Sequence, residues 1–164
     1  MPEAKTNAGQ RLTHMNTLLT NRIAEVSLTY SSKVPASERI QVKSSHDAEK
    51  AFRLVFPDLE YREYFYVMLL NRANKILGTF QVSSGGITGT VVDPRLVFQS
   101  ALKANATSLI VAHNHPSGQL TPSEADIELT KKLKAGGAVL DIPVLDHVII
   151  TESSYYSFAD EGIM

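Results

Sequence analysis

Two histidines separated by one residue open the part of the sequence that carries the most chemistry. His113 and His115 are followed by Ser123 and Asp126. Two neutral imidazole nitrogens and one carboxylate oxygen are a common ligand set for catalytic zinc, and they leave a fourth tetrahedral position open for water. The spacing therefore predicts a divalent metal site and, with it, hydrolytic chemistry.

The two histidines are expected at the end of a buried strand. Residues 108–112 form a short apolar run with β-branched members, which is typical of such a strand, and His113 and His115 continue it. Alternate residues of a strand share a face, so both imidazoles point the same way and Asn114 points away. Pro116 favours an extended backbone at His115 and begins the break in the strand.

A helix is expected to bring the carboxylate back over this strand end. Ser123 has the character of an N-cap and Asp126 of the acidic residue at position N3, where the helix dipole favours the ionised form. Taken singly, Asp126 and Ser123 fit a purely capping role, and a lone histidine at a strand end is usually only hydrogen-bonded. The conjunction of all four residues favours the metal.

The spacing His113-x-His115-x10-Asp126, with Ser123 three residues before the aspartate, resembles the JAMM metalloprotease signature. The longer stretch HNHPSGQLTPSEADIELTKKL resembles the RadC branch of that family, also described as JAB or MPN domains. The similarity covers about residues 45–164 and includes three further stretches, residues 63–71, 92–95 and 145–150, as well as Ser157 and Phe158.

The resemblance implies a fold, a reaction and a general base. The implied fold is α/β, a three-layer α-β-α sandwich with a mixed sheet, the JAMM or cytidine-deaminase-like fold. It would occupy residues 45–164, after an N-terminal extension over residues 1–44. The implied function is a Zn²⁺-dependent metallopeptidase or isopeptidase that hydrolyses peptide or isopeptide-linked protein substrates with a metal-activated water. The family's catalytic glutamate matches Glu63, and Ser123 would donate its proton to the oxyanion. Without the resemblance, Glu63 would read as a solvated residue at a strand start.

Three alternatives remain open at this stage. One is a DNA repair or mobile-element accessory role of the RadC type, with the metal site serving some other purpose. Longer family members carry an N-terminal helical region of DNA-binding type, which the pattern of residues 1–42 does not indicate. The second is an iron site with two histidines and one carboxylate, although no feature supplies a cosubstrate site. The third is a scaffold that has lost its metal, which the presence of all three ligands disfavours.

Composition narrows the function classes. The net charge of −1 gives no support to a nucleic-acid-binding surface, and the absence of cysteine excludes the thiolate ligands of the zinc deaminases. No HExxH motif occurs, so a zincin is excluded. No apolar run is long enough for a membrane span and the N-terminus lacks a signal-peptide core, so we expect a cytoplasmic protein without a membrane partner. The oligomeric state is not readable.

Patterning also predicts the order of the elements. We expect strands around residues 26–30 and 40–42, then a helix that begins at Ser44 or Ser45 and stops at Pro57, and then a hairpin over residues 63–83. A second helix is expected to begin at Asp93 and Pro94 and to lead into the strand that carries the histidines. The helix that carries Asp126 is expected to end at Gly136 and Gly137, and late strands are expected over residues 139–142 and 144–150. For His147, in the last of these, we expect a structural or hydrogen-bonded role.

Overall fold

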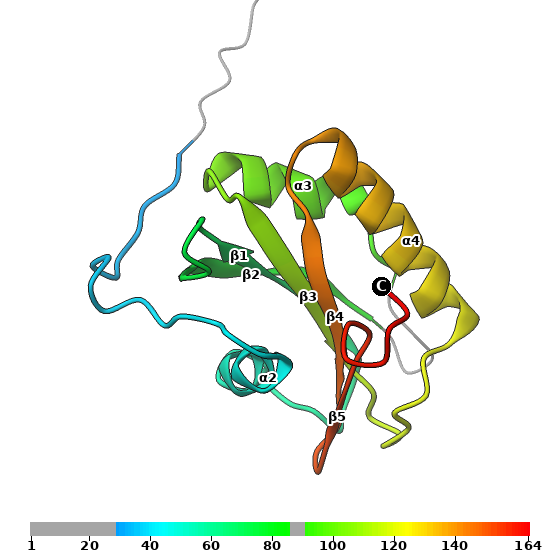
Figure 1. Cartoon of the computed structure of the whole chain (residues 1–164). Coiled ribbons are helices and arrows are strands. Elements are labelled where there is room, and N and C mark those ends of the chain that lie inside the picture. Colours follow the sequence, from blue (N-terminus) through cyan, green and yellow to red (C-terminus); the bar gives the residue numbers. More distant parts are fainter. Residues whose placement is uncertain (1–28, 86–90) are drawn as a thin grey trace, which may run out of the picture.

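The structure, a computed structural model, describes residues 29–85 and 91–164. Over these residues the chain forms three helices and five strands, in the order α2 (Ser45–Arg53), β1 (Tyr64–Leu70), β2 (Ile76–Ser84), α3 (Pro94–Lys103), β3 (Ser108–Asn114), α4 (Glu124–Val139), β4 (Val144–Ile150) and β5 (Tyr155–Ser157). One sheet lies between α2 on one face and α3 with α4 on the other (Figure 1). The predicted three-layer α/β fold is therefore confirmed.

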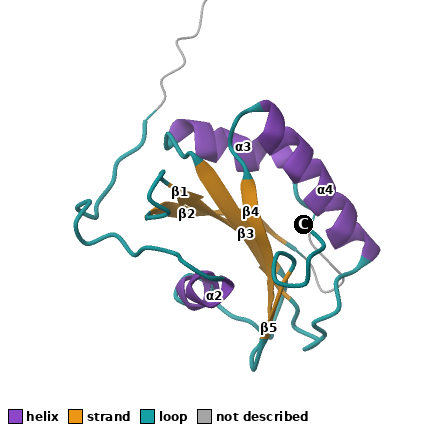
Figure 2. Cartoon of the chain, viewed as in Figure 1, coloured by secondary structure: helices purple, strands orange, loops and turns teal. Residues whose placement is uncertain are grey.

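The sheet has the order β2-β1-β3-β4-β5 and is mixed, because only β3 and β4 run parallel (Figure 2). The hairpin of β1 and β2 forms where the sequence predicted it. The central strand β3 is buried along its whole length. A strand covered on both faces needs apolar side chains on both, which explains why residues 109–112 are all apolar.

Two apolar cores fill the space between the layers. The core under α3 and α4 includes Phe65, Val111 and Leu133, whereas the core under α2 includes Phe52, Ile110 and Val148. Neighbouring residues of one strand thus serve different cores, as the alternation of side chains in a strand requires.

Helices α2 and α3 begin at the predicted caps. The Ser44 hydroxyl accepts a hydrogen bond from the backbone of Asp47, and the Asp93 carboxylate accepts one from the backbone of Arg95, with Pro94 in the first turn of α3. Side-chain acceptors of this kind satisfy backbone N–H groups that have no partner within the helix.

The prediction that Gly136 and Gly137 end the third helix was wrong, as was the strand over residues 139–142. Helix α4 runs through both glycines to Val139, and the chain then turns through Asp141 at φ 54°. The glycines serve close packing instead. A Cβ at Gly137 would lie 2.5 Å from the Ile142 carbonyl oxygen, and one at Gly136 would lie 2.8 Å from the Phe98 ring.

The N-terminal strands have different outcomes. The strand expected around residues 40–42 is reduced to one bridge between Gln41 and Lys75, which docks this segment at the start of β2. The segment expected as a strand at residues 26–30 lies outside the described residues except for Thr29 and Tyr30, which are not in a strand.

Candidate metal centre

The end of β3 places both histidines on the α4 side of the sheet. His113 pairs with Phe65 of β1 and is buried, and its ring stacks on the Phe65 ring at 6.1 Å between centroids. His115 extends the ladder, because its backbone N–H donates to the Ile150 carbonyl at 3.0 Å. The two imidazoles therefore point the same way, as the sequence predicted.

A capping box at the start of α4 places the carboxylate. The Ser123 hydroxyl accepts a hydrogen bond from the Asp126 backbone N–H at 3.2 Å, and the Asp126 Oδ2 accepts one from the Ser123 backbone N–H at 2.8 Å. The Ser123 hydroxyl also donates to Oδ2 at 2.7 Å. Because Oδ2 accepts both of these bonds, Oδ1 is the oxygen directed at His113.

His113, His115 and Asp126 come together as a group that could hold a metal ion, with one ligand atom from each within 4.8 Å of the others. The His113 Nε2 lies 2.9 Å from the His115 Nε2 and 3.3 Å from the Asp126 Oδ1, and the His115 Nε2 lies 3.8 Å from the Asp126 Oδ2. A tetrahedral zinc ion with bonds of about 2.0–2.1 Å separates its ligand atoms by about 3.3 Å. The observed spacings bracket that value, so the donor set fits zinc.

The orientation of His115 supports the same reading. Its Nδ1 lies 2.6 Å from the Gln119 carbonyl oxygen, which can only accept a hydrogen bond, so Nδ1 carries the proton. The Nε2, which lies near His113 and Asp126, is then the ring nitrogen available to a metal. Gly118, at φ 77°, allows the turn that brings Gln119 back to this ring. A ligand histidine held through its other nitrogen by a backbone carbonyl is the usual arrangement in metal sites.

Burial keeps His113 uncharged. Loss of solvent lowers the pKa of the His113 imidazole below its ordinary value, and the nearby Asp126 carboxylate offsets only part of this shift. Burial likewise lowers the pKa of His147 well below the ordinary value. Neutral imidazole is the form that binds metals, so this environment suits a ligand.

The structure gives His147 a more specific position than the sequence indicated. Its Nε2 lies 2.8 Å from the His113 Nδ1, and its Nδ1 lies 2.6 Å from the Thr130 Oγ1. The hydrogen-bonded role expected for His147 is therefore confirmed, but its partner is a candidate ligand. Neither contact could be predicted from local sequence spacing, because His113, Thr130 and His147 lie on three different elements.

Glu63 lies directly before β1, at the same end of the sheet. The pairing of β1 with β3 begins at Phe65 and His113, so Glu63 lies two residues before the first paired residue of β1. Its carbonyl oxygen accepts a hydrogen bond from the Gly85 N–H at 2.8 Å. The predicted base therefore directly precedes the strand that pairs with the His113 strand.

Asn114, between the two histidines, holds the segment that carries Glu63. Its buried side chain accepts a hydrogen bond from the Tyr64 backbone N–H at 2.7 Å. Its Nδ2 donates to the carbonyl oxygens of Leu59 and Arg62 at 2.9 and 2.8 Å. The sequence predicted that this side chain points away from the histidines, but not that it ties residues 59–64 to the metal strand.

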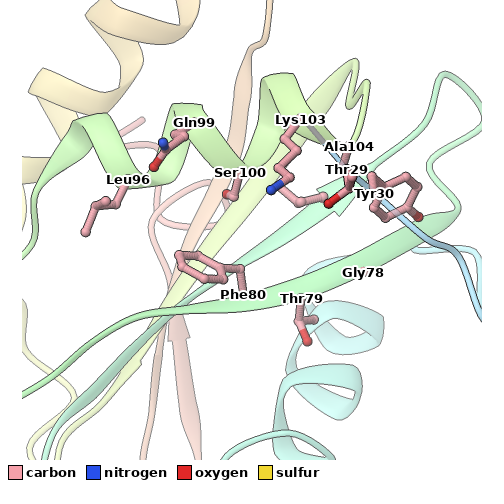
Figure 3. A pocket seen from close by; sticks show the side chains of 11 residues that line it. Thr29, Tyr30, Gly78, Thr79, Phe80, Leu96, Gln99, Ser100, Lys103 and Ala104 are labelled. Carbon is pink, nitrogen blue, oxygen red and sulfur yellow. The ribbon is translucent and has the colours of Figure 1, made fainter. Parts of the chain in front are cut away.

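A separate cavity of about 460 Å³ lies between β2 and α3. Its lining includes Tyr30, Phe80, Leu96 and Lys103, and none of the three candidate ligands (Figure 3). The Tyr30 hydroxyl donates to the Leu77 carbonyl at 2.6 Å at this edge of the sheet. The candidate metal centre is therefore defined by its donor atoms and not by this cavity.

Comparison with known proteins identifies the family of this chain. Residues 42–163 match the family model of the RadC-like JAB domain. The chain is 51% identical over 123 residues to a UPF0758 protein of Flavobacterium johnsoniae, covering 75% of this chain and 53% of that protein. It is 38% identical over 137 residues to a UPF0758 protein of Porphyromonas gingivalis, covering 82% and 60%. This chain belongs to the RadC-like JAB domain family.

The chain spans about half the length of the curated relatives it matches. A UPF0758 protein of Pelobacter propionicus is 46% identical to it over 103 residues, which cover 45% of that protein.

In the part of the chain that the structure describes, no helix is both long and apolar enough to cross a membrane.

Proposed function

We propose that this chain is a zinc-dependent hydrolase of amide bonds, acting on peptide or isopeptide-linked protein substrates. The observation that carries the proposal is the convergence of three acceptor atoms, from His113, His115 and Asp126, at the spacing of a tetrahedral ion. One of the three is a carboxylate oxygen, and a metal cation among them would satisfy all three at once. Membership of the JAB family supports the hydrolytic interpretation.

The bound ion would supply Lewis acidity toward the scissile carbonyl and would lower the pKa of a water to about 7. Glu63 accepts the proton of the attacking water and returns it to the leaving amine. A base at the start of β1 is well placed for this, because β1 borders the strand that ends in the two histidines. The hydrogen bonds of Asn114 keep that strand start in place.

Ser123 supplies the hydrogen-bond donor for the developing oxyanion. In the structure its proton is given to the Asp126 Oδ2 at 2.7 Å. During the reaction this proton turns toward the substrate oxygen, while the hydroxyl oxygen keeps accepting the Asp126 backbone N–H. A hydroxyl can do both, since it is a donor and an acceptor.

The proposal is tested with the zinc-loaded full chain against two probes, a library of internally quenched peptides and a set of lysine isopeptide conjugates. We expect cleavage of at least one probe by the wild type, and a decrease of about 10²–10³-fold in kcat for Ser123→Ala at unchanged zinc stoichiometry. If zinc binds at the triad of His113, His115 and Asp126 but no probe is cleaved, the peptidase assignment is contradicted. The site would then be a metal site with another function.

A further inference from the structure

A continuous chain of hydrogen bonds links two of the candidate ligands through groups that are not ligands. The Thr130 Oγ1 donates to the backbone carbonyl of Asp126 at 2.6 Å and lies 2.6 Å from the His147 Nδ1. The His147 Nε2 lies 2.8 Å from the His113 Nδ1. His147 is fully buried and Thr130 is 2% exposed, so water does not compete for these bonds.

The number of available protons fixes the donor and the acceptor of each hydrogen bond in this series. A threonine hydroxyl has one proton, and the Asp126 carbonyl oxygen can only accept it. The Thr130 oxygen must therefore accept from the His147 Nδ1, which leaves the His147 Nε2 without a proton. The 2.8 Å contact then requires the proton to sit on the His113 Nδ1. The opposite direction would leave two oxygen acceptors 2.6 Å apart with no proton between them.

We propose that Thr130 and His147 are positioning residues that hold His113 in the tautomer whose Nδ1 carries the proton and whose Nε2 is free to bind the metal. This inference rests on the metal site of the proposed function. The opposite tautomer would direct an N–H from the His113 Nε2 at the metal position and would prevent coordination.

The packing around His147 makes this arrangement rigid. The Phe158 ring stacks on the imidazole with centroids 4.6 Å apart and planes 12° from parallel, and the Phe65 ring meets it at 66°. The His147 backbone N–H donates to Asp146 at 2.7 Å. Contacts with two aromatic rings restrict rotation of the imidazole, which would exchange its nitrogens.

The same chain of bonds also joins three elements at the site. It runs from α4, which carries Asp126, through β4 to the end of β3, which carries His113. The protein thus sets the distance between a ligand nitrogen and a ligand carboxylate through its own hydrogen bonds. Residues in such a position typically change metal affinity by about 10–100-fold when they are removed.

The first experiment reads the tautomers directly, by long-range ¹⁵N–¹H correlation spectra of the imidazole rings in the metal-free full chain. We expect His113 and His147 both to be protonated at Nδ1. A His113 ring protonated at Nε2 would overturn the inference, whatever the chain does with zinc.

The second experiment measures the zinc dissociation constant by competition with a chromogenic chelator. Thr130→Val removes the hydroxyl at nearly constant volume, and we expect zinc binding to weaken by about 10-fold. Thr130→Ser is the matched control, which restores the hydroxyl and should restore the affinity. Circular dichroism melting curves report whether either variant is misfolded, in which case the tautomer spectra of the wild type still decide.

The outcomes separate this inference from the proposed function. If the wild type binds zinc at the triad but Thr130→Val binds it equally well, the positioning role is wrong and the metal site stands. If the wild type binds no zinc, the proposed function fails, and so does the inference, even where the tautomers are as expected.

Discussion

Asp146 and His147 are consecutive residues of β4, yet they anchor two buried polar clusters of different kinds. Asp146 pairs with Ile110, on the α2 side of the sheet, and His147 pairs with Val111, on the α4 side. The Asp146 carboxylate accepts hydrogen bonds from the Ser157 hydroxyl at 2.6 Å and from the backbone N–H groups of His147 and Ala159 at 2.7 and 3.0 Å. Every bond in this cluster pairs an acceptor with a donor.

The cluster on the His147 side does not close in this way. It ends at three atoms, from His113, His115 and Asp126, that face one another. A buried polar network whose donors and acceptors match stabilises the fold, whereas one that ends in converging acceptors calls for a ligand. The comparison is the basis for expecting a structural role for Asp146 and a ligand-binding role for the cluster around His113.

The largest effect is expected from Asp126→Ala. Removing the carboxylate leaves two imidazoles, and we expect stoichiometric zinc binding to be lost. The change also removes part of the helix cap, and the loss of a capping side chain should lower the free energy of unfolding by about 1 kcal/mol. Equilibrium dialysis with zinc and urea unfolding measure the two quantities. Glu124→Ala, an exposed acidic residue in the same helical turn, is the control and should bind zinc normally.

Glu63→Gln separates catalysis from metal binding. The amide keeps the size of the side chain but cannot take a proton, so turnover of a cleaved probe should fall by about 10²–10⁴-fold. Zinc affinity should remain that of the wild type. Glu60→Gln is the matched control, an exposed glutamate on the same segment. Equal turnover of Glu63→Gln and the wild type would refute the base assignment.

Asp146→Ala tests the structural side of the comparison. It leaves a buried hydroxyl and two backbone N–H groups without their acceptor, and we expect the free energy of unfolding to fall by about 2–4 kcal/mol. Chemical denaturation measures this loss. Zinc should still bind at one equivalent, and a loss of zinc as complete as in Asp126→Ala would show that the two clusters are not separate.

The smallest effect is expected in the pH dependence of stability. Burial raises the pKa of Asp146 above its ordinary value of 3.8, helped by the nearby Asp160 and opposed by its hydrogen bonds. The folded state thus binds this proton more tightly than the unfolded state, and the contribution to stability falls as pH rises from about 3.8 through the raised pKa.

Asp146→Asn removes the charge and keeps one acceptor oxygen. Relative to this variant, the wild type should lose stability as the pH rises through that window, by about 1.4 kcal/mol for each unit of difference between the folded and unfolded pKa. Urea unfolding at a series of acidic pH values measures the difference. Parallel curves for the two proteins would contradict the buried-carboxyl interpretation.

The parts of the site that the sequence predicted are those encoded locally. The strand that ends in His113 and His115 and the cap formed by Ser123 and Asp126 depend on spacings of two and three residues, which strand and helix geometry translate directly into positions. Glu63 needed the family resemblance, because β1 and β3 are distant in the sequence and only their pairing brings this end of β1 beside the end of β3.

The parts that the sequence did not predict depend on contacts between distant elements. The hydrogen bond between His113 and His147 joins residues 34 positions apart in the sequence. The hydrogen bonds of Asn114 to residues 59–64 join a strand to a loop. The prediction that Gly136 and Gly137 end a helix was wrong because a glycine pair can either end a helix or allow close packing. The close packing is against the Phe98 ring and the Ile142 carbonyl, which are neighbours only in the folded structure.

The most direct test of the metal centre is a crystal structure of the zinc-soaked full chain, with anomalous diffraction recorded on both sides of the zinc absorption edge. We expect one strong anomalous peak about 2.0–2.2 Å from the Nε2 atoms of His113 and His115 and from a carboxylate oxygen of Asp126. Zinc bound elsewhere, or no peak among these three residues at saturating zinc, would contradict the account.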